Sequence, residues 1–212
     1  MATEIELKYQ LSENINENST VVADITTLLQ SKGISFEVDV NALENDYFDN
    51  DELTLRKLDF GLRIRSKGNK YEQTIKTAGE VVGSMHKRPE YNVDLSSKEL
   101  DLALFPRNIW PEGVDFSALQ QSLKVIFSTH FTRQTWLIHQ KDSVIELALD
   151  CGSIATLSGS KSIVINEIEI ELVSGTEASL FALAKQLKSV VAMEPSSVSK
   201  AARGYSLYYE DN

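Results

Sequence analysis

The sequence predicts an α+β fold: an eight-stranded β-barrel with flanking helices. Eight segments have the residue pattern of strands, while helical patterns fall near the two ends and in one stretch between strands. Such a number of strands commonly closes into a barrel, which leaves no exposed sheet edge. Several predicted strands alternate charged and apolar residues, which places the charges on one face. Because these charged faces carry both signs, we expect them to line the inside of the barrel.

The predicted strands are separated by recognisable turn residues. Gly68-Asn69 is a two-residue hairpin signal, and Gly79 to Gly83 is expected to be a turn. Residues 45–49 continue the second strand and lead toward a short helix near Leu53 to Leu58. In chain order the strands are residues 3–10, 34–40, 60–67, 70–78, 86–95, 126–139, 143–154 and 162–173.

The predicted helices lie at the ends of the chain and between residues 96 and 126. Residues 19–32 place an apolar stripe on one helix face and are followed by Gly33, a typical C-terminal stop. Thr176 is a plausible N-cap for a helix through Val191. Residues 96–126 contain Pro106 and Pro111 and few β-branched runs, so we expect a helical insertion within one domain spanning 1–212. The other predicted helices are residues 98–104, 116–123 and 199–208.

Composition narrows the possible partners and compartments. The chain has 212 residues, is 42% hydrophobic and can therefore bury a sizeable core. Its formal net charge of −10 argues against nucleic acid as a general partner. The single cysteine, Cys151, excludes an internal disulfide framework and suits the cytoplasm. We see no signal-peptide pattern and no apolar run of about 20 residues that would span a membrane.

Three strand motifs carry the chemical prediction. The stretches 4–8, 61–65 and 167–171 each put like-spaced charged side chains on one strand face. Taken alone, each could be the solvated face of a strand. The three carboxylates of 167–171 repel one another, however, and favour a nearby cation. Carboxylates suit Mg²⁺ or Mn²⁺, and arginines bind phosphate oxygens in pairs. Together the motifs predict a ligand with several phosphates and a metal at one side.

The order of the charged motifs resembles the CYTH superfamily, also called triphosphate tunnel metalloenzymes. The resemblance covers nearly the whole chain, and it is strongest toward bacterial inorganic triphosphatases in the stretches 88–92 and 199–205. It rests on E-x-E-x-K at Glu4, Glu6 and Lys8, L-R-x-R at Leu62 to Arg65, Lys76, R-x-E at Arg88 and Glu90, Arg133, E-x-x-x-D at Glu146 and Asp150, E-x-E within Glu167 to Glu171, and S-K-x-x-R at Ser199, Lys200 and Arg203. Many such proteins carry a following helical CHAD domain, which we do not expect within residues 1–212.

The resemblance implies an antiparallel tunnel in which a triphosphate is hydrolysed with Mg²⁺ or Mn²⁺. Three glutamates alternate where the E-x-E motif needs two, so which two of them face the metal stays open. The residues expected to be catalytic are Glu4, Glu6, Lys8, Glu169 and Glu171. The expected substrate-binding residues are Lys8, Arg63, Arg65, Lys76, Arg88, Arg133, Lys200 and Arg203. The expected metal ligands are Glu4, Glu6, Glu146, Asp150, Glu167, Glu169 and Glu171.

The leading functional hypothesis is an inorganic triphosphatase that converts tripolyphosphate to pyrophosphate and phosphate. Three alternatives stay open at this point. A class IV type adenylyl cyclase would form cyclic AMP from ATP, and a thiamine triphosphatase would act on another triphosphate. A non-catalytic polyphosphate-binding module would keep the bases and lose the acids, whereas this sequence has both. Fold alone does not decide among them.

Overall fold

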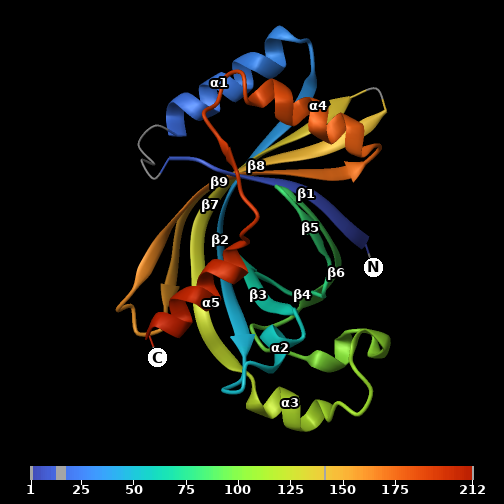
Figure 1. Ribbon diagram of the computed structural model, residues 1–212, viewed down its shortest axis with the longest axis vertical. Coiled ribbons are helices and arrows are strands. Elements are labelled where there is room, and N and C mark those ends of the chain that lie inside the picture. The colour runs from blue at the N-terminus through green and yellow to red at the C-terminus, as the bar shows by residue number, and fades with distance from the viewer. Residues whose placement is uncertain (1, 13–17, 141, 212) are drawn as a thin grey trace.

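Eight strands form a closed antiparallel barrel in the computed structural model, which describes residues 2–12, 18–140 and 142–211 (Figure 1). Around the barrel the order is β1-β9-β8-β7-β2-β3-β4-β6, and β6 pairs again with β1 to close the ring. The predicted fold class is therefore confirmed. The barrel strands are β1 (Ala2–Gln10), β2 (Ser35–Asp49), β3 (Gly61–Lys67), β4 (Lys70–Lys76), β6 (Met85–Leu95), β7 (Lys124–Gln140), β8 (Ser143–Thr156) and β9 (Ser162–Ser174).

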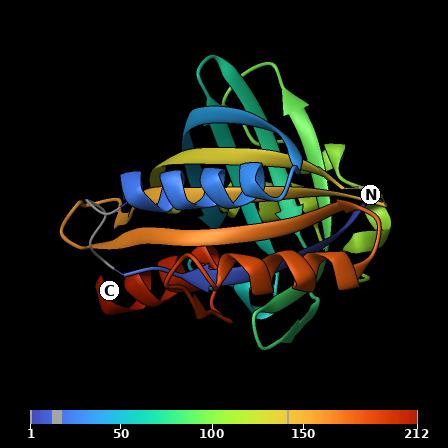
Figure 2. The ribbon, with the colours of Figure 1, turned by 90° about the horizontal axis from the view of Figure 1, so that it is seen from above.

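The part of the barrel under the helices that follow β1 and β9 is apolar outside and charged inside, whereas the end covered by the C-terminal helix holds an apolar cluster that includes Phe127 and Phe131. On β9, Ile168 and Ile170 are fully buried against the helices that cover the outer face, and the glutamates that alternate with them point to the interior. Figures 1 and 2 show α1 (Asn18–Ser31) and α4 (Glu177–Leu187) lying across this part of the sheet. The apolar face of these alternating strands is thus buried under helices, and the charged face is turned inward.

The C-terminal helix α5 (Lys200–Asp211) is fixed against the barrel by close packing. At Gly204 the helix approaches the Phe127 ring so closely that a Cβ atom would overlap it. The Tyr205 hydroxyl donates to the buried Asp49 carboxylate at 2.8 Å. These contacts set the position of Lys200, the first residue of the helix, relative to the barrel interior.

Residues 96–123 connect β6 to β7 with less helix than expected for the insertion predicted over 96–126, whose last three residues belong to β7. Only Leu102–Leu104 and Arg107–Ile109 form 3₁₀ turns, so the helix predicted over 98–104 is wrong. Asp101 caps the first turn by accepting from the Ala103 N–H, and Pro106 blocks its continuation. α3 (Phe116–Ser122) follows. With α2 (Thr54–Lys57), the insertion packs an apolar cluster on the outer face of β3 and β4.

Two short strands extend the sheet beyond the barrel. Residues 79–83, predicted to be only a turn, contain β5 (Glu80–Val82), which pairs with β6. β10 (Glu194–Pro195) pairs with the end of β1, and α4 stops at Leu187 rather than at the predicted Val191. None of the helices in the described ranges combines the length and apolar character that a bilayer crossing requires.

Candidate active site

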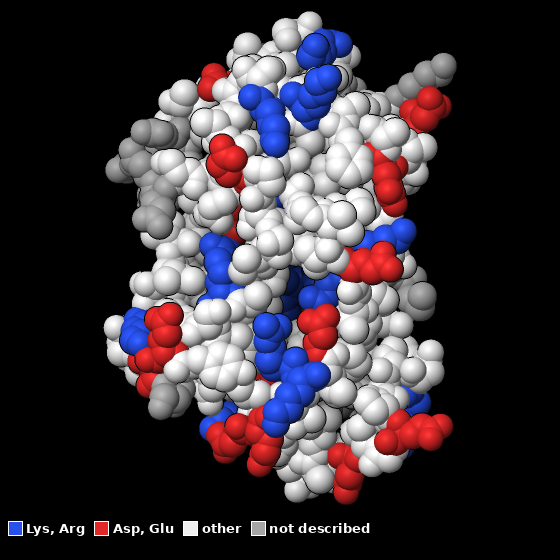
Figure 3. Space-filling model, in the orientation of Figure 1, with Lys and Arg blue, Asp and Glu red and all other residues white. Residues whose placement is uncertain are grey.

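The barrel encloses a cavity of about 510 Å³ whose walls are dominated by charge. Figure 3 shows basic side chains around the recess in the middle of one face. Among the described residues, seven acidic and seven basic side chains line the cavity, so its formal charge is balanced. The predicted site residues that line it are Glu4, Glu6, Lys8, Arg63, Arg65, Lys76, Arg88, Arg133, Glu146, Glu169, Glu171 and Lys200. The lining does not include Asp150, Glu167 or Arg203.

Four carboxylates on three neighbouring strands form what we call the acidic row: Glu4, Glu6, Glu146 and Glu171. Glu6, Glu171 and Glu146 lie opposite one another in register across β1, β9 and β8. Glu171 has no ion-pair partner among the described residues. Burial, together with repulsion from Glu4 and Glu6, raises the pKa of Glu171 to about 7. The row therefore holds more negative charge than the surrounding cations compensate.

The other members of the row have partial compensation. Lys76 pairs with Glu4, yet burial still raises the pKa of the Glu4 carboxyl. Lys8 Nζ lies 2.8 Å from a Glu6 carboxylate oxygen, and Arg133 is 4.0 Å from Glu146. A cation placed against the row would relieve both the repulsion and the desolvation that these groups carry.

A second group, which we call the paired cluster, lies deeper: Asp150, Glu167 and Glu169 with Arg133 and Lys200. One oxygen of each carboxylate lies within 4.8 Å of the others, close enough for a shared cation. Lys200 already fills that role, contacting Glu167, Asp150 at 2.6 Å and Glu169 at 3.1 Å. Arg133 holds Asp150 through two 2.7 Å hydrogen bonds and reaches Glu169 at 2.5 Å.

The titration behaviour of the paired cluster is opposite to that of the acidic row. Burial alone would raise the pKa of Glu169, but Lys200, Lys8 and Arg133 hold it well below its usual range. The pKa of Asp150 is lowered in the same way, against burial, by Arg133 and Lys200. Lys8 joins the two groups, because its Nζ lies 2.5 Å from Glu169 as well as beside Glu6. The cluster is thus compensated by the protein itself.

Arg63 and Arg65 of β3 face the acidic row from another part of the barrel, and we call them the cationic wall. Arg65 donates from Nε to the Asn45 side-chain oxygen at 2.9 Å and has no carboxylate partner among the described residues. Burial, then repulsion from Arg63 and Arg133, lowers the pKa of Arg65 to about 10. Arg63 lies 3.9 Å from Glu90, and its buried Nε has no hydrogen-bond partner in the described structure. Both groups are suited to bind an anion.

The remaining predicted bases differ in the contacts that they make within the protein. Lys76 bridges Glu4 and Glu90, the latter at 3.0 Å. Arg88 donates to the backbone carbonyls of Thr77 and Asp59 at the cavity edge. Arg203 pairs with Glu167 and donates to the Val164 carbonyl at 3.3 Å. Arg203 therefore supports the paired cluster from outside the cavity.

Sequence reasoning missed several neutral residues of the site. Asn45 and Tyr47 lie opposite Arg65 and Arg63 in register, and both line the cavity. The signal available in the sequence was weak, because it required knowing the β2–β3 register. His86 is also missed: it is 4% exposed, lies opposite Glu6 and leaves its Nε2 without a partner in the described structure. Thr74 and Asn92 complete this set.

Comparison with known proteins agrees with this geometry. The CYTH domain family model matches residues 2–205, and the chain belongs to this family. It is 38% identical over 208 residues to the inorganic triphosphatase of Haemophilus influenzae, covering 98% of this chain. The chain spans 55% of the length of that relative.

Solved structures show the same fold at low sequence identity. A Hippeastrum protein described as a putative adenylyl cyclase with a dominant triphosphatase activity is 19% identical, with a TM-score of 0.67 over 96% of this chain and 95% of that one. A putative adenylate cyclase from Bacillus halodurans is 23% identical, with a TM-score of 0.54 over 96% and 98% of the two chains. At these identities the likeness concerns the fold alone.

Proposed function

We propose that this chain is a metal-dependent inorganic triphosphatase that hydrolyses tripolyphosphate to pyrophosphate and phosphate. The observation that carries the proposal is the separation of charge within one cavity. The acidic row, whose Glu171 has no ion-pair partner among the described residues, occupies one part of the cavity. The cationic wall occupies another part, with Arg63 only 3.9 Å from Glu90 and Arg65 without a carboxylate at ion-pair distance in the described structure. A polyphosphate accompanied by a divalent cation satisfies both parts at once. The named activity of the Haemophilus relative supports the same assignment.

The acidic row fits Mg²⁺ or Mn²⁺ by the chemistry of its donors. All four groups offer carboxylate oxygens, which hard divalent cations prefer. Glu4, Glu6 and Glu171 would hold the ion, with Glu146 beside Glu171 in register. When bound, such an ion lowers the charge on phosphate oxygens and makes phosphorus easier to attack. We assign Asp150 and Glu167 instead to holding Lys200, Arg133 and Arg203, which modifies the expectation that they are metal ligands.

Substrate binding exchanges ion-pair partners rather than adding charge to an empty cavity. The balanced lining means that a polyanion must replace carboxylates as partners of the cations. Phosphate oxygens would bind Arg63 and Arg65 directly and would compete with Glu4 and Glu90 for Lys76. Each displaced carboxylate then needs a new cation, so binding of phosphate and of metal would be mutually favourable.

The reaction itself is an in-line displacement at a terminal phosphorus. A water oxygen forms the new P–O bond, the bond to the bridging oxygen breaks, and pyrophosphate leaves with that electron pair. The water proton passes to a basic oxygen of the site or to solvent. Lys8 and the cationic wall would position the phosphates and stabilise the charge on the leaving group. Catalysis here depends on fixed charges that are set in place before substrate arrives.

The cavity lining favours hydrolysis over cyclase chemistry. Its aromatic rings, apart from His86, are Tyr47 and Phe131 among the described residues, and both are about 5% exposed. Tyr47 stacks on Phe127, and Arg133 and Lys200 lie over the Phe131 ring. Neither ring offers a free face for an adenine base. The free thiol of Cys151 agrees with the cytoplasmic location that we also propose.

Product analysis tests the function. The purified chain would be incubated with Mg²⁺ or Mn²⁺ and, separately, with tripolyphosphate, ATP and thiamine triphosphate. We expect equal amounts of phosphate and pyrophosphate from tripolyphosphate and much slower use of the two organic triphosphates. Cyclic AMP from ATP would replace the proposal with the cyclase. Tight binding of tripolyphosphate without turnover under either metal would make the chain a binding module.

A further inference from the structure

The cavity has a third charged feature, at the end of the cationic wall away from Lys76. Arg65 on β3, Glu72 on β4 and Asp94 on β6 lie side by side in register. Glu72 lines the cavity and Asp94 is exposed, so the two carboxylates stand at the edge of the site. We call Glu72 and Asp94 the acidic rim.

The acidic rim is only partly compensated: Arg65, opposite Glu72, attracts that carboxylate, but among the described residues no cation lies within ion-pair distance of either rim carboxylate. Like charges directly opposite on an antiparallel pair are destabilising. Neither Glu72 nor Asp94 has an ion-pair partner among the described residues. Lys67, the next residue after Arg65 on the same face of β3, pairs instead with Asp39 at 3.6 Å. At this level of the barrel one arginine, Arg65, therefore stands against two carboxylates.

The distance of the acidic rim from the acidic row matters for a linear substrate. Lys76 pairs with Glu4 of the acidic row, and Lys76 and Glu72 are four residues apart on β4. At a rise of 3.3–3.4 Å per residue, that separation is about 13 Å along the strand. A phosphate chain that starts at the acidic row and runs past Arg63 thus reaches Arg65 and Glu72 together, because these two residues lie opposite each other.

We propose that Glu72, supported by Asp94, sets the length of phosphate chain that this site accepts. The inference rests on the proposed function and specifies its substrate. A triphosphate would end between the levels of Arg63 and Arg65, short of Glu72, with both guanidinium groups compensating its last charges. A fourth phosphate would carry its charge against two carboxylates and would be repelled. The rim therefore selects tripolyphosphate against longer linear polyphosphates by making the longer chain unfavourable.

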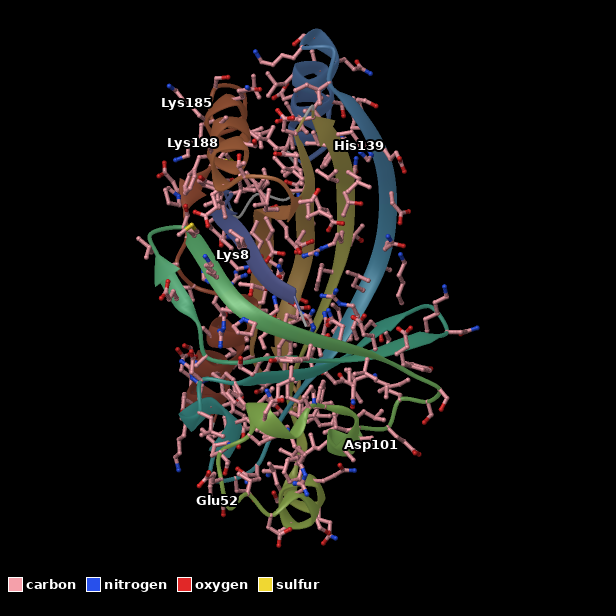
Figure 4. The ribbon with its side chains drawn as sticks, turned by 90° about the vertical axis from the view of Figure 1, so that its right-hand side faces the viewer. Lys8, Glu52, Asp101, His139, Lys185 and Lys188 are labelled. Carbon is pink, nitrogen blue, oxygen red and sulfur yellow. The ribbon has the colours of Figure 1, made fainter. Side chains whose placement is uncertain are left out.

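The test compares tetrapolyphosphate with tripolyphosphate in matched variants. Glu72→Gln and Asp94→Asn each remove one negative charge with little change of shape. Glu52→Gln makes the same change on an exposed residue at the far end of the molecule from Lys8 (Figure 4). We expect Glu72→Gln to raise kcat/KM for tetrapolyphosphate relative to tripolyphosphate by roughly five- to tenfold, on the scale of one charge repulsion near a protein surface. Asp94→Asn should have a smaller effect because it is more exposed, and Glu52→Gln should have none.

Binding measured by calorimetry without divalent metal separates this inference from the proposed activity. The ratio of the dissociation constants for tetrapolyphosphate and tripolyphosphate should shift in Glu72→Gln by a similar factor, even if the chain hydrolyses neither compound. The shift should shrink in high salt, since it is a charge effect. An unchanged ratio in Glu72→Gln would overturn the inference. The inference would also be overturned if Glu72→Gln bound thiamine triphosphate more weakly than the wild type and tetrapolyphosphate equally well. The rim would then serve to bind a cationic group.

Discussion

The acidic row and the paired cluster both gather carboxylates inside one barrel, yet they differ in what balances them. In the paired cluster, Lys200 contacts all three carboxylates and Arg133 contacts Asp150, and the pKa values of Asp150 and Glu169 are lowered. In the acidic row, Glu171 has no such contact in the described structure, and its pKa is raised. Proximity of carboxylates alone therefore does not identify a metal site. The group to look for is the one whose charge the protein leaves uncompensated.

The difference arises from where the chain supplies its cations. Helix α5 starts at Lys200 and places that ammonium among the carboxylates of β8 and β9. The acidic row lies further along the same strands, where Lys8 and Lys76 are each shared with carboxylates outside the row. Glu169 and Glu171 are only two residues apart on one face, but only Glu169 is within reach of Lys200. Adjacent positions of one motif thus acquire opposite roles.

Glu171→Gln should have the largest effect on activity. Removing the uncompensated carboxylate takes away a proposed metal ligand, and we expect turnover of tripolyphosphate to fall by roughly 1,000-fold. Folding should be intact, because the change also removes repulsion from Glu4 and Glu6. Phosphate release and thermal unfolding would be measured together. If this variant turned over tripolyphosphate like the wild type, the assignment of Glu171 to the site would be wrong. Glu4→Ala and Glu6→Ala should lose turnover in the same way as Glu171→Gln.

Asp150→Asn should have the largest effect on stability. It leaves Arg133 and Lys200 buried with one carboxylate fewer, and breaking such a pair typically costs about 3–5 kcal/mol. Urea unfolding would measure the loss, with Glu52→Gln as the control for a single carboxylate on the surface. If Asp150→Asn unfolded like the wild type but lost metal binding, the division into a supporting cluster and a binding row would be wrong.

Arg65→Gln should act on the substrate rather than on the fold. The guanidinium has no carboxylate at ion-pair distance in the described structure, and the cost of its burial opposes the weaker attraction from Glu72, so stability should be nearly unchanged. We expect KM for tripolyphosphate to rise about tenfold, the scale of a charge-assisted hydrogen bond to phosphate. Steady-state kinetics would show this, with the variant Glu52→Gln unchanged. A loss of stability with an unchanged KM would contradict the assignment of Arg65 to the cationic wall.

The pH dependence of the metal-free protein should show the uncompensated carboxylate in stability alone, without any effect on substrate. Because the pKa of Glu171 is about 7 when folded and its ordinary value is 4.5, the folded state binds more protons between these values. Stability contributed by this group is thus greatest at low pH and is lost as pH rises through 7, by about 3 kcal/mol in all. Urea unfolding in EDTA from pH 5 to 8 would measure it. In the Glu171→Gln variant, the free energy of unfolding should change less with pH. An equal pH dependence in the two proteins would contradict the raised pKa of Glu171.

The sequence allowed the barrel and most of the site to be predicted, because both depend on short-range alternation. Charges at Glu4, Glu6, Arg63 and Arg65 could be placed on one strand face without knowing any contact. The roles of individual carboxylates could not be predicted, because they depend on strand register and side-chain length. Whether a carboxylate such as Glu167 meets a metal or Lys200 is decided by where α5 packs, through contacts such as Gly204 against Phe127.

Local sequence also misled where capping competed with helix formation. The stretch before Pro106 contains good helix formers, yet Asp101 caps a single 3₁₀ turn and the chain leaves it at Phe105. The short strand β5 was hidden for a related reason, since its three residues are too few to show a period. Neither error touches the site, because both segments lie outside the ring of eight strands.

The most direct test of the central claim is calorimetric titration of Mn²⁺ into the wild type, Glu171→Gln and Asp150→Asn at pH 8. The proposed acidic row predicts that Glu171→Gln loses most of the affinity, while folded Asp150→Asn binds Mn²⁺ within a few fold of the wild type. Retained affinity in Glu171→Gln together with lost affinity in Asp150→Asn would place the metal in the paired cluster and contradict the account.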